Sequence, residues 1–202
     1  IVGVSSLLIA CNIFHLYHNF ADSFEMSFFQ VSNVITTTGF GFGNTVDWPL
    51  FSQFLLLMLM VVGGSAGSTA GGLKVIRCLI LARIGKNQIR SMLSPNRVMT
   101  LHINGSSLDK DTQHKILKYF VVYTLIMIAL IAVVSFDSNN FMTVVSAVFS
   151  CFNNIGPMIG TTDTFAIFSP ISKLLLSIAM IAGRLEIYPM LLLFMPRTWS
   201  NR

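Results

Sequence analysis

Long apolar segments alternate with shorter polar ones along the whole chain. Residues 1–18, 119–136 and 170–196 are apolar enough to be membrane spans, since about 20 apolar residues cross a bilayer. A further apolar stretch, residues 49–84, is 36 residues long. As one helix it would extend roughly 54 Å, against a hydrocarbon core of about 30 Å. We therefore expect this stretch to tilt strongly, to project from the membrane, or to break.

The break is predicted at residues 63–72, where no side chain is larger than threonine and five of ten residues are glycine. Each glycine disfavours a helix by about 1 kcal/mol relative to alanine. The flanking segments, Leu50–Val62 and Leu73–Arg83, have ordinary helical composition. Irregular backbone at membrane depth persists only where protein buries it or where it lines a wet cavity.

Two other interpretations of this glycine-rich segment were considered. Gly63, Gly67 and Gly71 also fit a GxxxGxxxG face for close helix packing, and that alternative stays open. A phosphate-binding loop does not fit, because Gly71-Gly72-Leu73-Lys74 lacks the required GK[ST] ending.

Two short helix-compatible segments, residues 27–35 and 145–152, each lead into a glycine-containing loop between spans. When Gly39 is aligned with Gly156, the offset is 117 residues, and the chain becomes two copies of span, short re-entrant helix, extended loop and span. An ordinary extracellular glycine turn is the alternative for residues 37–41. The predicted fold class is an all-α polytopic membrane protein with two such repeats and one broken second span.

The charge pattern supports a membrane protein and gives its orientation. The chain is 53% hydrophobic and 10% charged, whereas soluble proteins average about a quarter charged. Lysine and arginine are absent before Lys74 and between Lys118 and Lys173. By the positive-inside rule, residues 84–118 and the C-terminal tail with Arg197 and Arg202 are cytoplasmic. The same clustering argues against a nucleic-acid partner.

The remaining chemistry excludes other classes of site. The three cysteines are isolated in apolar surroundings and form no zinc or haem spacing. No nucleophile–base arrangement or paired carboxylate site is recognisable, so we expect no enzyme and no cofactor beyond a transported ion. Loops rich in carbonyl oxygen can replace the hydration shell of a hard cation. The C-terminal dipole end of a preceding short helix would favour cations over anions.

Four stretches together give a specific resemblance. They closely resemble the TrkH-type potassium uptake proteins of the Trk/Ktr/HKT superfamily, in the right order over essentially the whole chain. The stretches are residues 36–40 (TTTGF), 63–77 (GGSAGSTAGGLKVIR), 153–157 (NNIGP) and 183–186 (GRLE).

The resemblance implies the third and fourth of four M1–P–M2 repeats. The third would be residues 1–92, the cytoplasmic connection 93–117 and the fourth 118–202. It places the filter glycines at Gly39 and Gly156. The implied filter residues are Thr37, Thr38, Gly39, Phe40, Asn154, Ile155, Gly156 and Pro157, with K⁺ held by the carbonyls of Thr37, Thr38, Asn154 and Ile155. Pro157 stands where the first loop has an aromatic residue, so the filter is not fourfold symmetric.

The resemblance also implies that residues 63–72 form an intramembrane gate faced by Arg184. An arginine in an apolar span is costly unless it meets water or a partner, and a snorkelling interfacial arginine is the alternative. Lys74 fits equally a cation barrier at the pore mouth and a positive-inside anchor. The implied gate residues are Gly63, Gly64, Ser65, Gly67, Ser68, Thr69, Gly71, Gly72, Lys74 and Arg184.

The expected function is channel-like K⁺ uptake in the bacterial inner membrane. Two loops cannot surround an axis, and the chain begins with Ile1, so we expect a missing N-terminal half of the same protein. The resemblance implies a homodimer and a cytosolic TrkA-like nucleotide-binding ring. A secondary transporter of a small solute and a non-transporting truncated subunit are the alternatives.

Overall fold

The computed structural model describes residues 1–41, 45–93, 102–103, 106–107 and 109–185. The expected span 170–196 is therefore described only as far as Leu185. The C-terminal tail lies outside the described residues, as does most of the polar connection between residues 94 and 108.

The first part of the chain is a hairpin of two helices followed by a third. Helix α1 (Val2–Tyr17) ends at His18, whose left-handed backbone (φ 55°) reverses the chain. Helix α2 (Phe20–Thr36) then begins at Asn19, and the Asn19 side chain accepts a hydrogen bond from the Ala21 N–H at 3.2 Å. Such a cap satisfies a helix N–H that has no partner within the helix. The third helix, α3, comprises Leu50–Val62.

The predicted break in the long apolar stretch is confirmed. Helix α3 ends before Gly63, and α4 (Val75–Leu93) begins after a loop. Hydrogen bonds join the two ends of this loop. The Leu73 N–H donates to the Val61 carbonyl at 2.9 Å, and the Val75 N–H donates to the Gly64 carbonyl at 3.0 Å. The loop backbone is not helical, so the GxxxGxxxG helix crossing is not formed. Helix α4 continues ten residues beyond the expected end at Arg83.

Helix α5 (Lys110–Val134) starts earlier than the apolar pattern predicts, nine residues before residue 119. Its first turn is polar and carries Asp111, which is favourable at the positive end of the helix dipole. Between α4 and α5 two strands of two residues each, β1 (His102–Ile103) and β2 (Ser106–Ser107), pair antiparallel. Apart from these strands, the described elements are helical, which confirms the expected class.

The second part of the chain repeats the order of two helices, a loop and a further helix. Helix α6 (Phe141–Phe152) begins at Asn140, whose side chain caps the Met142 N–H at 3.1 Å. A 3-10 turn, η1 (Phe165–Ile167), precedes α7 (Pro170–Leu185). Of these helices, α5 alone among the described elements is both long and apolar enough to cross a membrane. Shorter apolar helices are α1, α3 and α6.

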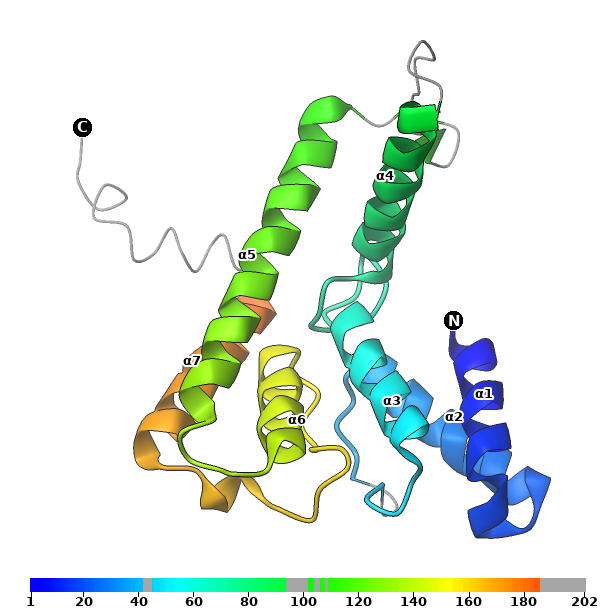
Figure 1. The fold of residues 1–202 in the computed structure, drawn as a ribbon, viewed down its shortest axis with the longest axis vertical. Coiled ribbons are helices and arrows are strands. Elements are labelled where there is room, and N and C mark those ends of the chain that lie inside the picture. The colour runs from blue at the N-terminus through cyan, green and yellow to red at the C-terminus, as the bar shows by residue number, and fades with distance from the viewer. Residues whose placement is uncertain (42–44, 94–101, 104–105, 108, 186–202) are drawn as a thin grey trace.

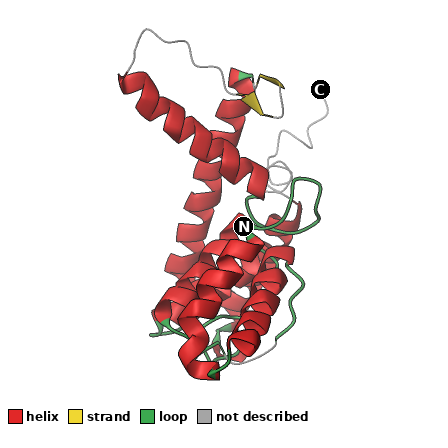
Figure 2. Cartoon of the chain, turned by 90° about the vertical axis from the view of Figure 1, so that its right-hand side faces the viewer, coloured by secondary structure: helices red, strands yellow, loops and turns green. Residues whose placement is uncertain are grey.

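The helices enclose two apolar clusters that meet around α6. One cluster joins α5, α6 and α7, and the other joins α1, α2 and α3 with Val145, Ile155 and Ile159 from the second part. Figures 1 and 2 show α4 and α5 extending together beyond the other helices, away from the turn between α1 and α2. Ile155 and Ile159, which follow α6, are buried in the second cluster, whereas Phe40 in the loop that follows α2 is 65% exposed.

Candidate ion-filter and gate site

The two candidate filter loops share two backbone features at an offset of 117 residues. Thr37 and Asn154 both adopt the left-handed region, with φ of 53° and 56°. The next residue donates its N–H to a carbonyl of the preceding helix in each loop: Thr38 to Asn33 at 3.1 Å, and Ile155 to Ser150 at 2.9 Å. Ile155 therefore takes the place of Thr38. The alignment of Gly39 with Gly156 is thus reproduced in the backbone.

The loops also contact one another directly. Gly39 (φ 84°) and Gly156 (φ 110°) both have backbone conformations that disfavour a side chain. A Cβ atom built on Gly39 would lie 2.6 Å from the Ile155 carbonyl oxygen, and one built on Gly156 would lie 3.5 Å from the Gly39 Cα. A glycine is therefore required at Gly39 for two reasons, conformation and space.

A buried polar side chain from each short helix holds its loop, and sequence reasoning missed both. The Asn33 amide accepts from the Phe40 N–H at 3.0 Å and donates to the Phe40 carbonyl. Ser150 lies at the same position 117 residues later, and its hydroxyl accepts from the Gly156 N–H at 3.1 Å. Pro157 has no N–H, so the second loop cannot copy the bond made by Phe40. The signal was present, because aligning the repeats places Asn33 against Ser150.

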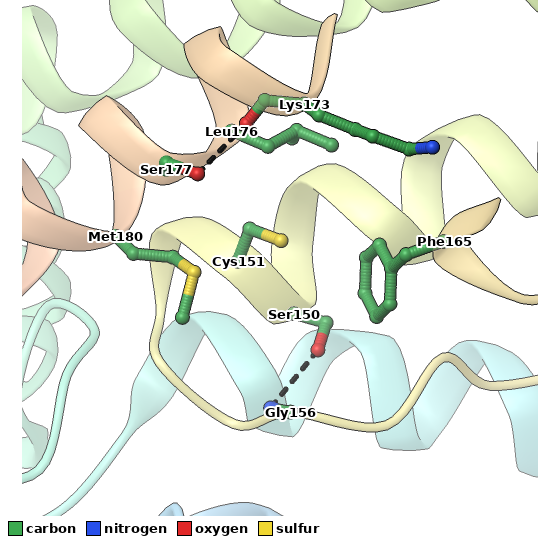
Figure 3. A pocket seen from close by; sticks show the side chains of 8 residues that line it. All are labelled: Ser150, Cys151, Gly156, Phe165, Lys173, Leu176, Ser177 and Met180. Carbon is green, nitrogen blue, oxygen red and sulfur yellow. Dashed lines mark hydrogen bonds between the residues drawn. The ribbon is translucent and has the colours of Figure 1, made fainter. Parts of the chain in front are cut away.

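A cavity adjoins the second loop on the side that faces α6 and α7. The cavity has a volume of about 240 Å³, and Figure 3 shows Gly156 on one side of it and Lys173 on another. The Ser150 hydroxyl bond to Gly156 crosses this region. The Asn154 side-chain nitrogen donates to the Met180 carbonyl of α7 at 3.0 Å.

The candidate gate loop, residues 63–72, folds back on itself and touches the second filter loop. A Cβ atom on Gly63 would collide with the Gly71 carbonyl, and one on Gly72 (φ 85°) would lie 3.1 Å from the Gly63 Cα. Gly71 packs against the Asn153 carbonyl so closely that a side chain there would overlap it. Around Gly67, in contrast, nothing lies within 4 Å of a Cβ position.

Within the gate loop itself, hydrogen bonds and small side chains hold the turn. Ser68 donates its N–H to the Ser65 carbonyl at 3.1 Å, and its hydroxyl accepts from the Ala70 N–H at 3.1 Å. A Cβ atom on Gly64 would lie 2.9 Å from the Ala70 Cβ. The loop is thus an ordered turn.

Arg184 reaches the gate loop from α7. Its Nη1 donates to the Thr69 carbonyl oxygen at 2.8 Å. A cavity of about 220 Å³ lies between this loop and α7, lined by Thr69, Lys74, Tyr119 and Arg184 among others. Lys74 has a left-handed backbone (φ 70°) at the end of the loop. The neighbouring Gly183 packs directly on the Phe152 carbonyl at the end of α6. The structure thus places the two positively charged residues of the predicted gate, Lys74 and Arg184, around one polar cavity.

Comparison with known proteins gives the family. A family model described as TrkH, cation transport protein, matches residues 15–201. The "Trk system potassium uptake protein TrkH" of Salmonella typhimurium is 35% identical over 99% of this chain and 43% of its own length. The corresponding protein of Escherichia coli K12 gives the same identity and coverage. The chain thus spans less than half the length of these relatives.

A solved structure agrees with the sequence comparison. The potassium transporter TrkH from Vibrio parahaemolyticus superimposes with a TM-score of 0.91 at 32% identity, over 99% of this chain and 43% of that one. The helical order, the glycine-bearing loops and the family match therefore agree. This chain is a membrane protein that belongs to the TrkH family of cation transport proteins.

Proposed function

We propose that the chain forms two of the four segments that line a K⁺-selective uptake pathway. The single observation that carries this proposal is the paired loop geometry: Gly39 and Gly156 meet, and each follows a left-handed residue and a hydrogen bond back to the preceding helix. Relatives that match this chain are named potassium uptake proteins. The carbonyls of Thr37, Thr38, Asn154 and Ile155 would take the place of water around K⁺.

The short helices before the loops favour a cation electrostatically. Helices α2 and α6 both end at their loop, so their C-terminal dipole ends carry partial negative charge there. Neither helix has a basic residue in its last turn. Filter residues Phe40 and Pro157 would follow the ligand carbonyls and shape the loops.

The loop 63–72 would act as the gate of this pathway. It packs against Asn153, the residue that directly precedes the second set of ligand carbonyls. Its hydrogen bond from Arg184 would hold it in place, and the charges of Arg184 and Lys74 would oppose passage of a cation. Opening of the gate would require the hydrogen bond between Arg184 and Thr69 to break.

The remaining parts of the pathway would come from outside this chain. Two loops cannot enclose an axis, so a preceding half of the same protein would supply two more, and the complete proteins would pair as homodimers. The basic positions of α4, which include Arg83, Lys86 and Arg90, would lie on the cytoplasmic side of the bacterial inner membrane. That end would meet anionic lipid headgroups or a TrkA-like regulatory ring.

Growth at limiting K⁺ tests the proposal. A strain that lacks its own K⁺ uptake systems should grow at low K⁺ when it expresses the complete protein that contains this chain. Growth that depends on K⁺ concentration and is lost with an empty vector supports the proposal. Absence of rescue, with the protein present in the membrane fraction, argues against it.

A further inference from the structure

Asn153 at the end of α6 is held by a tyrosine from a different helix. The Tyr123 hydroxyl of α5 donates to the Asn153 Oδ1 at 2.7 Å, and the Asn153 Nδ2 donates to the Phe149 carbonyl at 3.0 Å. Tyr123 is 4% exposed and Asn153 is fully buried. Removal of one partner would leave a buried polar atom without its hydrogen bond, which is costly in a dry environment.

The position of Asn153 gives this bond a specific consequence. Asn153 directly precedes Asn154 and Ile155, the candidate ligand residues, and its own carbonyl lies against Gly71 of the gate loop. The Tyr123 ring also packs on Phe152 of α6, with 5.1 Å between ring centroids. The start of the second filter loop is therefore fixed to α5 by both a ring contact and a hydrogen bond.

In the described residues, the first filter loop shows no equivalent of the Tyr123 bond. Thr36 occupies the place of Asn153, is exposed, and its hydroxyl bonds only locally, to the Ser32 carbonyl and the Thr38 hydroxyl, both at 2.6 Å. That loop is held instead by the two bonds between Asn33 and Phe40. The second loop is bonded to its own helix through the Ser150 carbonyl and hydroxyl and has a cavity behind it. Bonds to other helices also restrain it, to α7 through Asn154 and to α5 through Asn153.

We propose that Tyr123 is a positioning residue that fixes the second filter loop through Asn153 and thereby contributes to the preference for K⁺ over Na⁺. This inference rests on the proposed function as a K⁺ pathway. Carbonyls select between cations of similar charge only when their positions are restrained or their number is fixed. A loop released from α5 could move its carbonyls and accept the smaller ion more readily.

The test uses Tyr123→Phe in the complete transporting protein, with Tyr17→Phe as the matched control. Tyr17 is the last residue of α1. The control substitution removes the same hydroxyl group, which at Tyr17 makes no hydrogen bond to any other described residue. Rates of K⁺ and Na⁺ uptake into proteoliposomes are measured for both variants. Tyr123→Phe should lower the K⁺/Na⁺ rate ratio by roughly three- to tenfold, the factor expected for one hydrogen bond. Tyr17→Phe should leave the ratio unchanged.

A double-mutant cycle shows whether Tyr123 acts through Asn153. Asn153→Leu should lower the ratio by itself, and adding Tyr123→Phe should lower it no further, because the two residues share one interaction. An unchanged ratio in Tyr123→Phe overturns the inference. So does a fall of K⁺ and Na⁺ uptake by the same factor, or failure of the variant to accumulate, because the hydroxyl would then serve folding. Absence of K⁺ uptake by the native protein would instead refute the proposed function.

Discussion

Arg184 and Thr69 lie 115 positions apart in the sequence, and the Arg184 guanidinium donates to the Thr69 carbonyl oxygen at 2.8 Å. This bond ties α7 to the middle of the glycine-rich loop between α3 and α4. The loop has few side chains of its own to anchor it, so its contacts with other helices decide where it lies.

Removing the Arg184 side chain should open the pathway. Arg184→Gln loses both the charge and the bond to Thr69, and a hydrogen bond from a charged group is worth about 1.5–3 kcal/mol. K⁺ uptake into proteoliposomes should therefore rise by about tenfold or more. Lys173→Gln, at the other end of α7, is the control and should change uptake little. Uptake that stays equal or falls in Arg184→Gln would show that this arginine does not restrain the gate.

Two glycines of the gate loop should respond differently to alanine. Gly71→Ala places a methyl group against the Asn153 carbonyl, so the loop or the filter must shift. We expect a loss of about 1–3 kcal/mol in unfolding free energy, together with altered K⁺ uptake. Gly67→Ala meets open space and should be neutral or slightly stabilising. Thermal unfolding in detergent compares the two. Equal effects at both positions would mean that Gly71 does not pack on the filter.

Asp137 should make stability depend on pH in acid. Its carboxylate accepts hydrogen bonds from the Ser172 hydroxyl and from the Ser169 N–H and hydroxyl, and these lower its pKa below the ordinary 3.8. When the pKa of a carboxylate is lower in the folded state than in the unfolded state, the ionised group stabilises the protein at any pH above its unfolded-state pKa. That stabilisation is lost as the pH falls through the folded-state pKa. The stabilisation relative to Asp137→Asn should therefore be present at pH 6 and shrink below about pH 3.8.

The measurement is the thermal midpoint of native and variant protein between pH 3 and pH 6. Asp109→Asn serves as a control, since the Asp109 side chain makes no capping hydrogen bond at the start of α5. A difference at Asp137 that stays constant down to pH 3 would contradict the assigned role of its carboxylate.

Local features of this fold could be predicted from the sequence, and long-range contacts could not. The break at residues 63–72 followed from glycine content, and the two loops followed from their place between apolar segments. Residues 110–118 of α5 were missed because they are mostly polar. An apolar pattern marks only the part of a helix that lies in the membrane, whereas the helix itself can continue into water. The family expectation was confirmed by the comparison with TrkH proteins.

The contacts of the site needed the structure. The resemblance places Arg184 opposite the glycine-rich loop, but the sequence does not show that its partner there is the Thr69 carbonyl. Nor does it show that Tyr123 meets Asn153, because such pairs depend on how separate helices pack. The role of Asn33 was within reach, since its counterpart Ser150 lies at the repeat offset. Asn33 binds the Phe40 N–H, whereas Pro157 at the equivalent position has no N–H, and Ser150 binds the Gly156 N–H instead.

The central claim is that the loops at Gly39 and Gly156 form a K⁺ filter, and Gly39→Ser tests it most directly. Serine at φ 84° is strained and its Cβ would crowd the Ile155 carbonyl. Gly41→Ser, where a Cβ meets nothing within 4 Å, is the matched control. The K⁺/Na⁺ uptake ratio of the complete protein should fall about tenfold or more in Gly39→Ser, for a strain of roughly 1–3 kcal/mol, and stay unchanged in Gly41→Ser. A native ratio in Gly39→Ser would contradict the account.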